Sequence, residues 1–508
     1  MYGDPHLGHA RPAIIEIDDR GNIKLEKKRS LGVNFIFNMM RTMMGVIIPL
    51  ITFPYSSRVL GPEALGKVDY AQANMTYFTL LQAFGIGGYA IREGARIRDD
   101  RKKMDEFASD MLSINLMTSA LAYVLFFAAL AIPKLAGYRT LMLLFSTTII
   151  LSTIGVEWLY NIYEEYQYIT IRSFIFQIIS VVMLFTCVKS EDDYMIYALT
   201  MVISSVGSNI MNFIRARKYV KFKLRISKKL RIHLKPMSYI FLLDVASAVY
   251  LVMDRSMLGY ITGDDTEVGL YAAAIKIASV LTSFFSALYA VIRPRVAYMM
   301  ERDEEQAENL NDLTARLILL FNIPMAIGMF CLSRQVLHLF AGSKYLGVTS
   351  TMQVLMLNVI VATFNSFLIN QLFIIHRKDR WASMGVVIGA VTNVCLNALT
   401  IPVYGKFGAA ASTVAAELAI FIYASIKARH MYPITKLGWQ LGQSLIACIP
   451  IVCCYNWCAH SQYSDLLTIA LTVSIGAIGY FAIMILFRNR LVIDGIEKIK
   501  ERFSRTPV

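Results

Sequence analysis

The chain has 508 residues, of which 56% are hydrophobic and only 17% are charged, and its formal net charge is +14. Its mean hydropathy of +0.51 is more than a soluble core could bury, so the composition excludes a soluble globular protein. Windows of about 20 residues that are almost free of charge recur along the chain, and each is long enough to cross a bilayer as a helix. Lipid is therefore the expected solvent for most of the molecule.

The apolar windows predict fourteen membrane helices, which follow a polar segment, 1–30, that lacks the features of a signal peptide. The first six are expected at 32–54, 70–90, 108–132, 141–160, 171–188 and 194–214. The next six are expected at 236–261, 268–292, 313–332, 351–375, 381–401 and 407–426, and the last two at 437–459 and 466–487. The prediction is an all-α polytopic membrane protein.

A pair of short motifs repeats about 200 residues apart. The string from Arg58 to Gly61, followed by Gly66 and Tyr70, is echoed by the string from Arg255 to Gly259, followed by Gly269 and Tyr271. Six helices separate the copies, so two six-helix lobes of the same orientation should face each other across a central cavity. The expected segments are a polar tail 1–30, an N-lobe 31–214, a basic linker 215–235, a C-lobe 236–428, helices thirteen and fourteen at 437–487 and a basic tail 488–508.

Lysine and arginine are distributed unevenly between the loops. One set of loops holds clusters of them between 92 and 103, 215 and 235, 377 and 380, and in the tail, whereas the opposite set holds only scattered cations. Since cationic loops resist translocation, both termini are predicted to be cytoplasmic. The cations lie beside membrane helices without a reading helix or an aromatic platform, which argues against a nucleic-acid partner.

Several ionisable residues fall where the spans should be apolar: Arg41, Asp244, Asp254, Lys276 and Glu417. Each costs about 2.5–3.5 kcal/mol at a helix centre, so a hydrated cavity is the natural place for it. Arg58 and Arg255 occupy equivalent places in the two repeats, near the end of the first helix of each lobe, and pairing across the cavity is expected.

Two interpretations of these charges stay open. Arg41, Arg58, Arg255 and Lys276 are predicted to bind a phosphate or diphosphate, because guanidinium groups match phosphate oxygens, and Asp244, Asp254 and Glu417 are candidates for carrying a proton or sodium ion. Alternatively, the charges pair with each other, for example Asp254 with Lys276, and only hold helices together.

Other chemistry finds little support in the sequence. The string from Gly61 to Val68 resembles a phosphate-binding P-loop but has valine where a hydroxyl must hold magnesium. The seven cysteines lack paired zinc spacing, so no metal and no cofactor is expected. Without HExxH, GxSxG or DxD motifs, a transporter is favoured over an enzyme.

Four ordered motifs resemble those of the oligosaccharide flippases, the polysaccharide exporters of the multidrug/oligosaccharidyl-lipid/polysaccharide superfamily. They are Ile51–Tyr55 with Arg58–Glu63 and Gly66; Arg92–Asp100; Glu157–Tyr160 with Glu164, Glu165 and Tyr168–Thr170; and Asn393, Asn397, Ile401–Gly405, Gly408–Ala410 and Glu417. The resemblance spans 31–487.

The resemblance implies a flippase of a bacterial inner membrane that moves a lipid diphosphate-linked oligosaccharide, carried on undecaprenyl diphosphate, from the cytoplasmic to the outer leaflet by alternating access. It also implies membrane lipid, a proton or sodium ion, and a glycan polymerase with glycosyltransferases as partners. Whether the cargo is a peptidoglycan precursor or another polysaccharide unit stays open.

Two alternatives remain. A cation-coupled multidrug antiporter of the same superfamily would typically stop at twelve helices and favour acidic, aromatic cavities. A membrane glycan polymerase or ligase would be expected to carry a large external catalytic loop, whereas the predicted loops are short.

Overall fold

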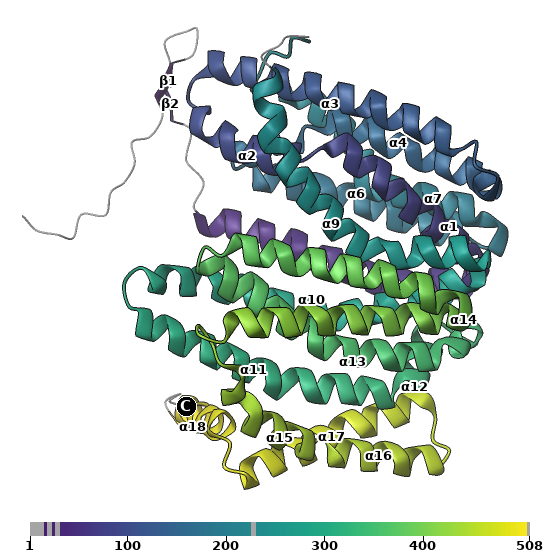
Figure 1. Cartoon of the computed structure of the whole chain (residues 1–508), viewed down its shortest axis with the longest axis vertical. Coiled ribbons are helices and arrows are strands. Elements are labelled where there is room, and N and C mark those ends of the chain that lie inside the picture. The colour runs from purple at the N-terminus through teal and green to yellow at the C-terminus, as the bar shows by residue number, and fades with distance from the viewer. Residues whose placement is uncertain (1–14, 18–22, 26–30, 225–229, 505–508) are drawn as a thin grey trace, which may run out of the picture.

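The computed structural model describes residues 15–17, 23–25, 31–224 and 230–504, so the predicted segments 1–30, 215–235 and 488–508 lie partly outside the described residues. Apart from a short antiparallel ladder, in which β1 (Ile15–Ile17) pairs with β2 (Ile23–Leu25), the described chain consists of helices and their connections (Figure 1). Twelve described helical stretches are long and apolar enough to cross a membrane. The predicted all-α polytopic fold is confirmed.

Two of these twelve stretches contain two crossings each, because a glycine folds the chain back without ending the hydrogen-bonded helix. In α1 (Leu31–Ala83) the bend is at Gly61, with φ 71° and ψ 176°, and in α14 (Asp379–Ala428) it is at Gly405, with φ 53° and ψ −131°. Only glycine adopts such backbone angles without a steric cost. Counting both halves of each gives the fourteen crossings that the hydropathy pattern predicts.

The N-lobe is built from α1 to α8. After α1 its elements are α2 (Ile86–Ile97), α3 (Arg101–Ala129), η1 (Pro133–Tyr138), α4 (Arg139–Gly155), α5 (Glu157–Ile162), α6 (Tyr166–Cys187), η2 (Glu191–Asp193), α7 (Tyr194–Val202), the π-helical η3 (Ile203–Gly207) and α8 (Asn209–Ala216). Asp100 caps α3 by accepting a hydrogen bond from the Lys103 backbone N–H, which lowers the pKa of this carboxyl.

The C-lobe is built from α9 to α14. Before α14 its elements are α9 (Arg231–Thr262), α10 (Asp265–Met300), α11 (Glu304–Cys331), α12 (Ser333–Phe340), η5 (Ser343–Val348), α13 (Thr349–Ser366) and the π-helical η6 (Phe367–Phe373). Figure 1 shows α9 crossing the N-lobe helices, while α10, α13 and α14 form the middle of the molecule.

A further helix pair packs beside the C-lobe and against α11, at the bottom of Figure 1. It comprises η7 (Ile434–Leu437), α15 (Gly438–Ala447), α16 (Ile449–His460) and α17 (Asp465–Leu486), and it is followed by α18 (Arg490–Ser504). Tyr480 of α17 donates a hydrogen bond to the Leu320 carbonyl of α11, with 2.8 Å between the oxygens. This pair adds an apolar wall to the C-lobe.

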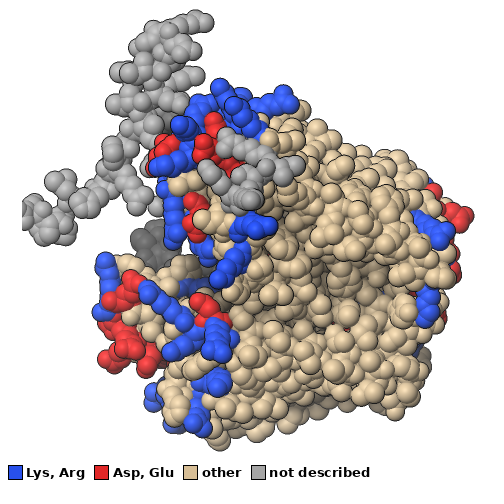
Figure 2. All heavy atoms as spheres, turned by 45° about the horizontal axis from the view of Figure 1, so that its top comes forward, with Lys and Arg blue, Asp and Glu red and all other residues tan. Residues whose placement is uncertain are grey.

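Charge marks the two ends of the molecule. Figure 2 shows lysine and arginine gathered at one end, a broad band with almost no charged side chains, and a few charges at the other end. We call these the cation-rich end and the opposite end. The uncharged band is the part that would lie in the hydrocarbon layer.

The lobes touch closely at the opposite end, where α1 crosses α10. A Cβ atom built on Gly66 would lie 1.7 Å from the carbonyl oxygen of Asp265, and one built on Gly269 would lie 1.9 Å from that of Pro62. Both glycines belong to the repeated motif. The repeat therefore supplies the two surfaces on which the lobes close.

Candidate functional site

A buried carboxylate joins two cations where the lobes meet. Asp69 of α1 is 3% exposed; one of its oxygens lies 3.2 Å from Lys276 Nζ of α10, and the other lies 3.9 Å from an Arg255 guanidinium nitrogen of α9. The Lys276 ammonium also lies 4.9 Å from the centre of the Phe53 ring. We call Asp69, Arg255 and Lys276 the interlobe cluster, because α1 belongs to one lobe and α9 and α10 to the other.

A second cluster with the same charges, two cations and one carboxylate, lies within the N-lobe. Arg41 of α1 donates to Glu157 over 2.6 Å, and Arg172 of α6 lies 3.7 Å from the other Glu157 oxygen. Arg172 is 4% exposed, whereas Arg41 and Glu157 are both partly exposed. We call these three residues the N-lobe cluster.

The two clusters lie at different depths. Arg41 precedes the bend at Gly61 by 20 residues, and Asp69 follows it by 8 residues. At a rise of 1.5 Å per residue, the N-lobe cluster lies about 30 Å from the bend and the interlobe cluster about 12 Å from it. Charged groups thus occur at two levels of the otherwise apolar band.

Each cluster contains two cations and one carboxylate, so each keeps one positive charge in excess. Buried guanidinium N–H groups also lack an acceptor in the described chain: Nε and Nη1 of Arg172, and Nε of Arg255. A phosphate group would supply both negative charge and acceptor oxygens there. The clusters are thus suited to an anion more than to helix pairing alone.

The four predicted cations do not form one site. Arg255 and Lys276 come together through Asp69, and Arg41 belongs to the N-lobe cluster. Arg58 lies at the opposite end, where it donates to the carbonyl oxygen of Leu339. The expectation that Arg58 and Arg255 pair across the lobes is therefore not met, because each contacts a different group.

The suggested pair of Asp254 with Lys276 is wrong, because Lys276 contacts Asp69. Asp254, which is 4% exposed, instead accepts hydrogen bonds from Tyr271 Oη at 2.7 Å, Thr413 Oγ1 at 2.7 Å and Asn397 Nδ2 at 2.6 Å. The Asn397 amide also donates to Asn393 Oδ1 at 3.0 Å. A buried carboxylate surrounded by neutral oxygens and amides can hold a proton or a small hard cation.

Of the other two predicted carboxylates, Glu417 lies one helical turn after Thr413 on α14, and its partner Tyr250 lies one turn before Asp254 on α9. Glu417 is buried and accepts hydrogen bonds from Tyr250 of α9 and Asn365 of α13. Asp244 is exposed, has no hydrogen-bond or ion-pair partner among the described contacts, and lies three helical turns before Arg255 on the same face of α9. Asp254 thus has three oxygen-bearing side chains as partners, and Glu417 has two.

Three charged residues of the clusters are missing from the predicted site. Asp69 precedes the repeated Tyr70 motif, Glu157 belongs to the string before Tyr160, and Arg172 opens the fifth span. A lone charge at a span boundary is easily read as interfacial, although each of these falls within a helix. No group of three or more His, Cys, Asp or Glu residues that could hold a metal occurs in the described part of the chain.

Comparison with known proteins shows the family of this chain. The family model described as "Polysaccharide biosynthesis protein" matches residues 31–300, more than half of the chain. A "Putative O-antigen transporter" of Shigella dysenteriae is 21% identical over 394 residues, which cover 77% of this chain and 96% of the relative. A relative of the same description from Escherichia coli (strain K12) is 24% identical over 277 residues, 53% of this chain and 66% of its own.

Solved structures share the fold. The lipid II flippase MurJ in an inward closed conformation superposes with a TM-score of 0.71 at 17% identity, over 90% of this chain and 99% of its own. An inward-facing multidrug resistance MATE family transporter of the MOP superfamily gives a TM-score of 0.60 at 14% identity, over 78% and 97%. The chain is thus a multi-pass membrane protein, and it belongs to the polysaccharide biosynthesis protein family.

Proposed function

We propose that this protein is a flippase that moves a lipid diphosphate-linked oligosaccharide from the cytoplasmic to the outer leaflet by alternating access. The cation-rich end and both termini face the cytoplasm in this proposal, because cationic loops resist translocation. The membrane is the inner membrane of a bacterial cell, and undecaprenyl diphosphate carries the glycan.

The observation that carries the proposal is the pair of clusters with excess positive charge at two depths of the apolar band. A diphosphate brings negative charge and several acceptor oxygens, which match the unpartnered N–H groups of Arg172 and Arg255. The N-lobe cluster, nearer the cation-rich end, would receive the headgroup first, and the interlobe cluster would hold it where the lobes meet. The acyl tail would stay in lipid.

The relatives and the fold support transport of such a cargo over the alternatives. Two relatives are described as O-antigen transporters, and the MurJ structure is that of a lipid II flippase. A multidrug antiporter is less well supported, since α15 to α17 add a further helix pair and the clusters carry excess positive charge. A glycan polymerase or ligase is less well supported too, since the described connections between helices are short.

The decisive test of the site is the removal of one cation from each cluster. Arg41→Ala and Arg255→Ala are each expected to abolish export of surface polysaccharide, because the remaining cation is then neutralised by the carboxylate. Export is measured by immunoblotting of the glycan in cells lacking the chromosomal copy, with protein amount in the membrane as the second measurement. Arg302→Ala, an exposed arginine at the cation-rich end, is the matched control. Wild-type levels of surface glycan in both Arg41→Ala and Arg255→Ala would contradict the proposal.

We also propose that Asp254 carries the coupling proton or sodium ion. Asp254→Asn keeps the shape but removes the charge, and flipping driven by an ion gradient is expected to fall at least about tenfold, since a charged hydrogen-bonded group contributes about 1.5–3 kcal/mol. The measurement is flipping of a fluorescent lipid-linked saccharide in proteoliposomes, with an imposed pH or sodium gradient. Asp244→Asn on the same helix is the matched comparison. If an ion gradient still drives flipping in Asp254→Asn, a group other than Asp254 carries the coupling ion.

A further inference from the structure

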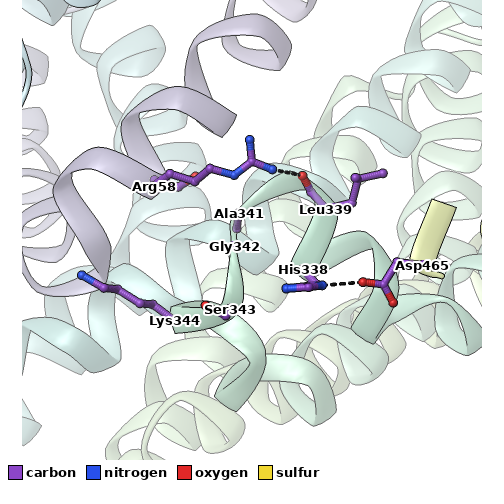
Figure 3. A pocket seen from close by; sticks show the side chains of 9 residues that line it. Arg58, His338, Leu339, Ala341, Gly342, Ser343, Lys344 and Asp465 are labelled. Atoms are coloured by element: carbon purple, nitrogen blue, oxygen red, sulfur yellow. Dashed lines mark hydrogen bonds and ion pairs between the residues drawn. The ribbon is translucent and has the colours of Figure 1, made fainter.

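A separate pocket lies at the opposite end of the molecule, with a volume of about 470 Å³. Its polar walls come from three parts of the fold: Ser57 and Arg58 from α1, His338 from α12 with Ser343 and Lys344 from η5, and Asp465 from α17. Figure 3 shows Arg58 reaching toward Leu339 and His338 directed at Asp465. The N-lobe, the C-lobe and the terminal helix pair therefore all contribute to one pocket.

The ion pairs around this pocket involve every charged side chain of its lining except Arg58. Lys344 pairs with Glu191 of the N-lobe, and His338 pairs with Asp465. Arg58 is exposed, and its guanidinium bonds only the neutral carbonyl oxygen of Leu339 among the described contacts. Each nearby carboxylate thus contacts a basic side chain of its own, whereas Arg58 contacts no carboxylate among the described residues and its guanidinium can reach a ligand.

We propose that this pocket binds the phosphate or diphosphate group of a ligand and that its occupancy holds the lobes closed at this end. The pocket volume is ordinary for a small-ligand site. The Arg58 guanidinium lies beside the Lys344 ammonium and the exposed Ser343 hydroxyl, and these groups are suited to phosphate oxygens. Arg58 and Lys344 lie on different lobes, so the complete site exists only while the lobes touch here. A ligand that binds one conformation stabilises that conformation.

The consequence for transport rests on the proposed function, in which this end is external. Phosphate groups that accumulate in the outer leaflet would then slow the reopening of the transporter toward that leaflet. The phosphate could belong to delivered lipid-diphosphate cargo or to an anionic phospholipid headgroup. Both sources present the same chemistry to Arg58.

Binding is tested with the full-length protein in phosphatidylcholine nanodiscs and inorganic diphosphate as the probe, at constant ionic strength. A saturable rise in Tm is expected for the wild type. In Arg58→Ala and Lys344→Ala the affinity should fall at least about tenfold, as loss of a charged hydrogen-bonding group predicts. Arg139→Ala is the matched control, since Arg139 is an exposed arginine at the same end whose Nε likewise bonds only a backbone carbonyl, that of Leu130. Arg58→Lys should bind more weakly than wild type and more tightly than Arg58→Ala.

The conformational effect is measured between spin labels at Gly137 of η1 and Gly347 of η5, where an added side chain has open space. Diphosphate should shift the distance distribution toward the short, closed population in the wild type and not in Arg58→Ala. The two possible sources of the phosphate are separated by repeating the titration in nanodiscs in which a fifth of the lipid is phosphatidylglycerol. If phosphatidylglycerol weakens diphosphate binding, the ligand is an anionic phospholipid headgroup. If it does not, the ligand is a soluble phosphate or the cargo.

No saturable shift in the wild type, or equal affinity in Arg58→Ala, Lys344→Ala and Arg139→Ala, would overturn the site. An unchanged distance distribution would overturn the closing effect. These readouts need no flipping, so they separate from the proposed function. Diphosphate binding without any saccharide flipping would remove the function and keep the site, whereas flipping without diphosphate binding would do the reverse.

Discussion

Replacing Asp69 with alanine is expected to abolish polysaccharide export and to lower the stability of the protein by about 3–5 kcal/mol, the cost of leaving a buried charge uncompensated. Asp69 is the one carboxylate within 4.0 Å of either Arg255 or Lys276 in the described chain. Without it the two cations repel each other where α1, α9 and α10 pack. Export is read from surface glycan, and stability from thermal unfolding of the purified protein.

A double variant separates charge balance from binding. Asp69→Ala combined with Lys276→Met removes one charge of each sign, so most of the stability lost in Asp69→Ala should return, and the Lys276→Met single variant completes the double-mutant cycle. Export should return only in part, because Arg255 keeps the one excess positive charge of the cluster while one of its two cationic donors is lost. Asp192→Ala is the control: it removes an exposed carboxylate at the opposite end of the molecule and should behave as wild type. A stable Asp69→Ala variant with normal export would show that the interlobe cluster contributes neither packing nor binding.

The fold can be predicted well because its signals are local. Hydropathy over about 20 residues finds each crossing, and the repeated motif suggests two similar lobes. What hydropathy cannot give is the continuity of the helix through Gly61 and Gly405, which depends on backbone angles that glycine alone tolerates. The fourteen predicted crossings are therefore contained in twelve described helical stretches, because α1 and α14 each supply two of them.

The site can be predicted only in part, because the partners of a charge are distant in the sequence. Asp69 and Lys276 are separated by 207 residues, and Arg41 and Glu157 by 116. The sequence identifies Arg41 and Lys276 because a charge within an apolar span is unfavourable in lipid, and it identifies Arg255 by its place in the repeated motif. It does not identify the carboxylates that offset them, so the predicted site is more cationic than the clusters that form.

Arg58 shows why equivalent places in a repeat need not be equivalent in space. It precedes the bend at Gly61 by three residues, whereas Arg255 precedes Gly263, which ends α9, by eight. At 1.5 Å per residue, Arg255 lies about 7 Å deeper. One arginine therefore lines a pocket at the opposite end of the molecule, and the other reaches the buried Asp69.

Filling the close contact between Gly66 of α1 and Gly269 of α10 is the second change for which we expect a large loss of export. Gly66→Ala and Gly269→Ala each place a methyl group less than 2 Å from a backbone carbonyl oxygen, which cannot move aside as a flexible side chain can. The lobes must then separate at this end, at a cost of about 1–3 kcal/mol for an overpacked contact. Alternating access requires this end to close, so export is expected to fall to background while the separate lobes stay folded.

Spin labels at Gly137 and Gly347 report the effect directly, because they lie on different lobes at this end. In Gly66→Ala the distance distribution should move to longer values and lose its short population. Gly137→Ala and Gly347→Ala, tested without labels, are the controls: each adds the same methyl group to open space, and both should export normally. Normal export by Gly66→Ala with an unchanged distance distribution would mean that the lobes do not need this contact, and transport would then have to proceed without closure at the α1–α10 crossing.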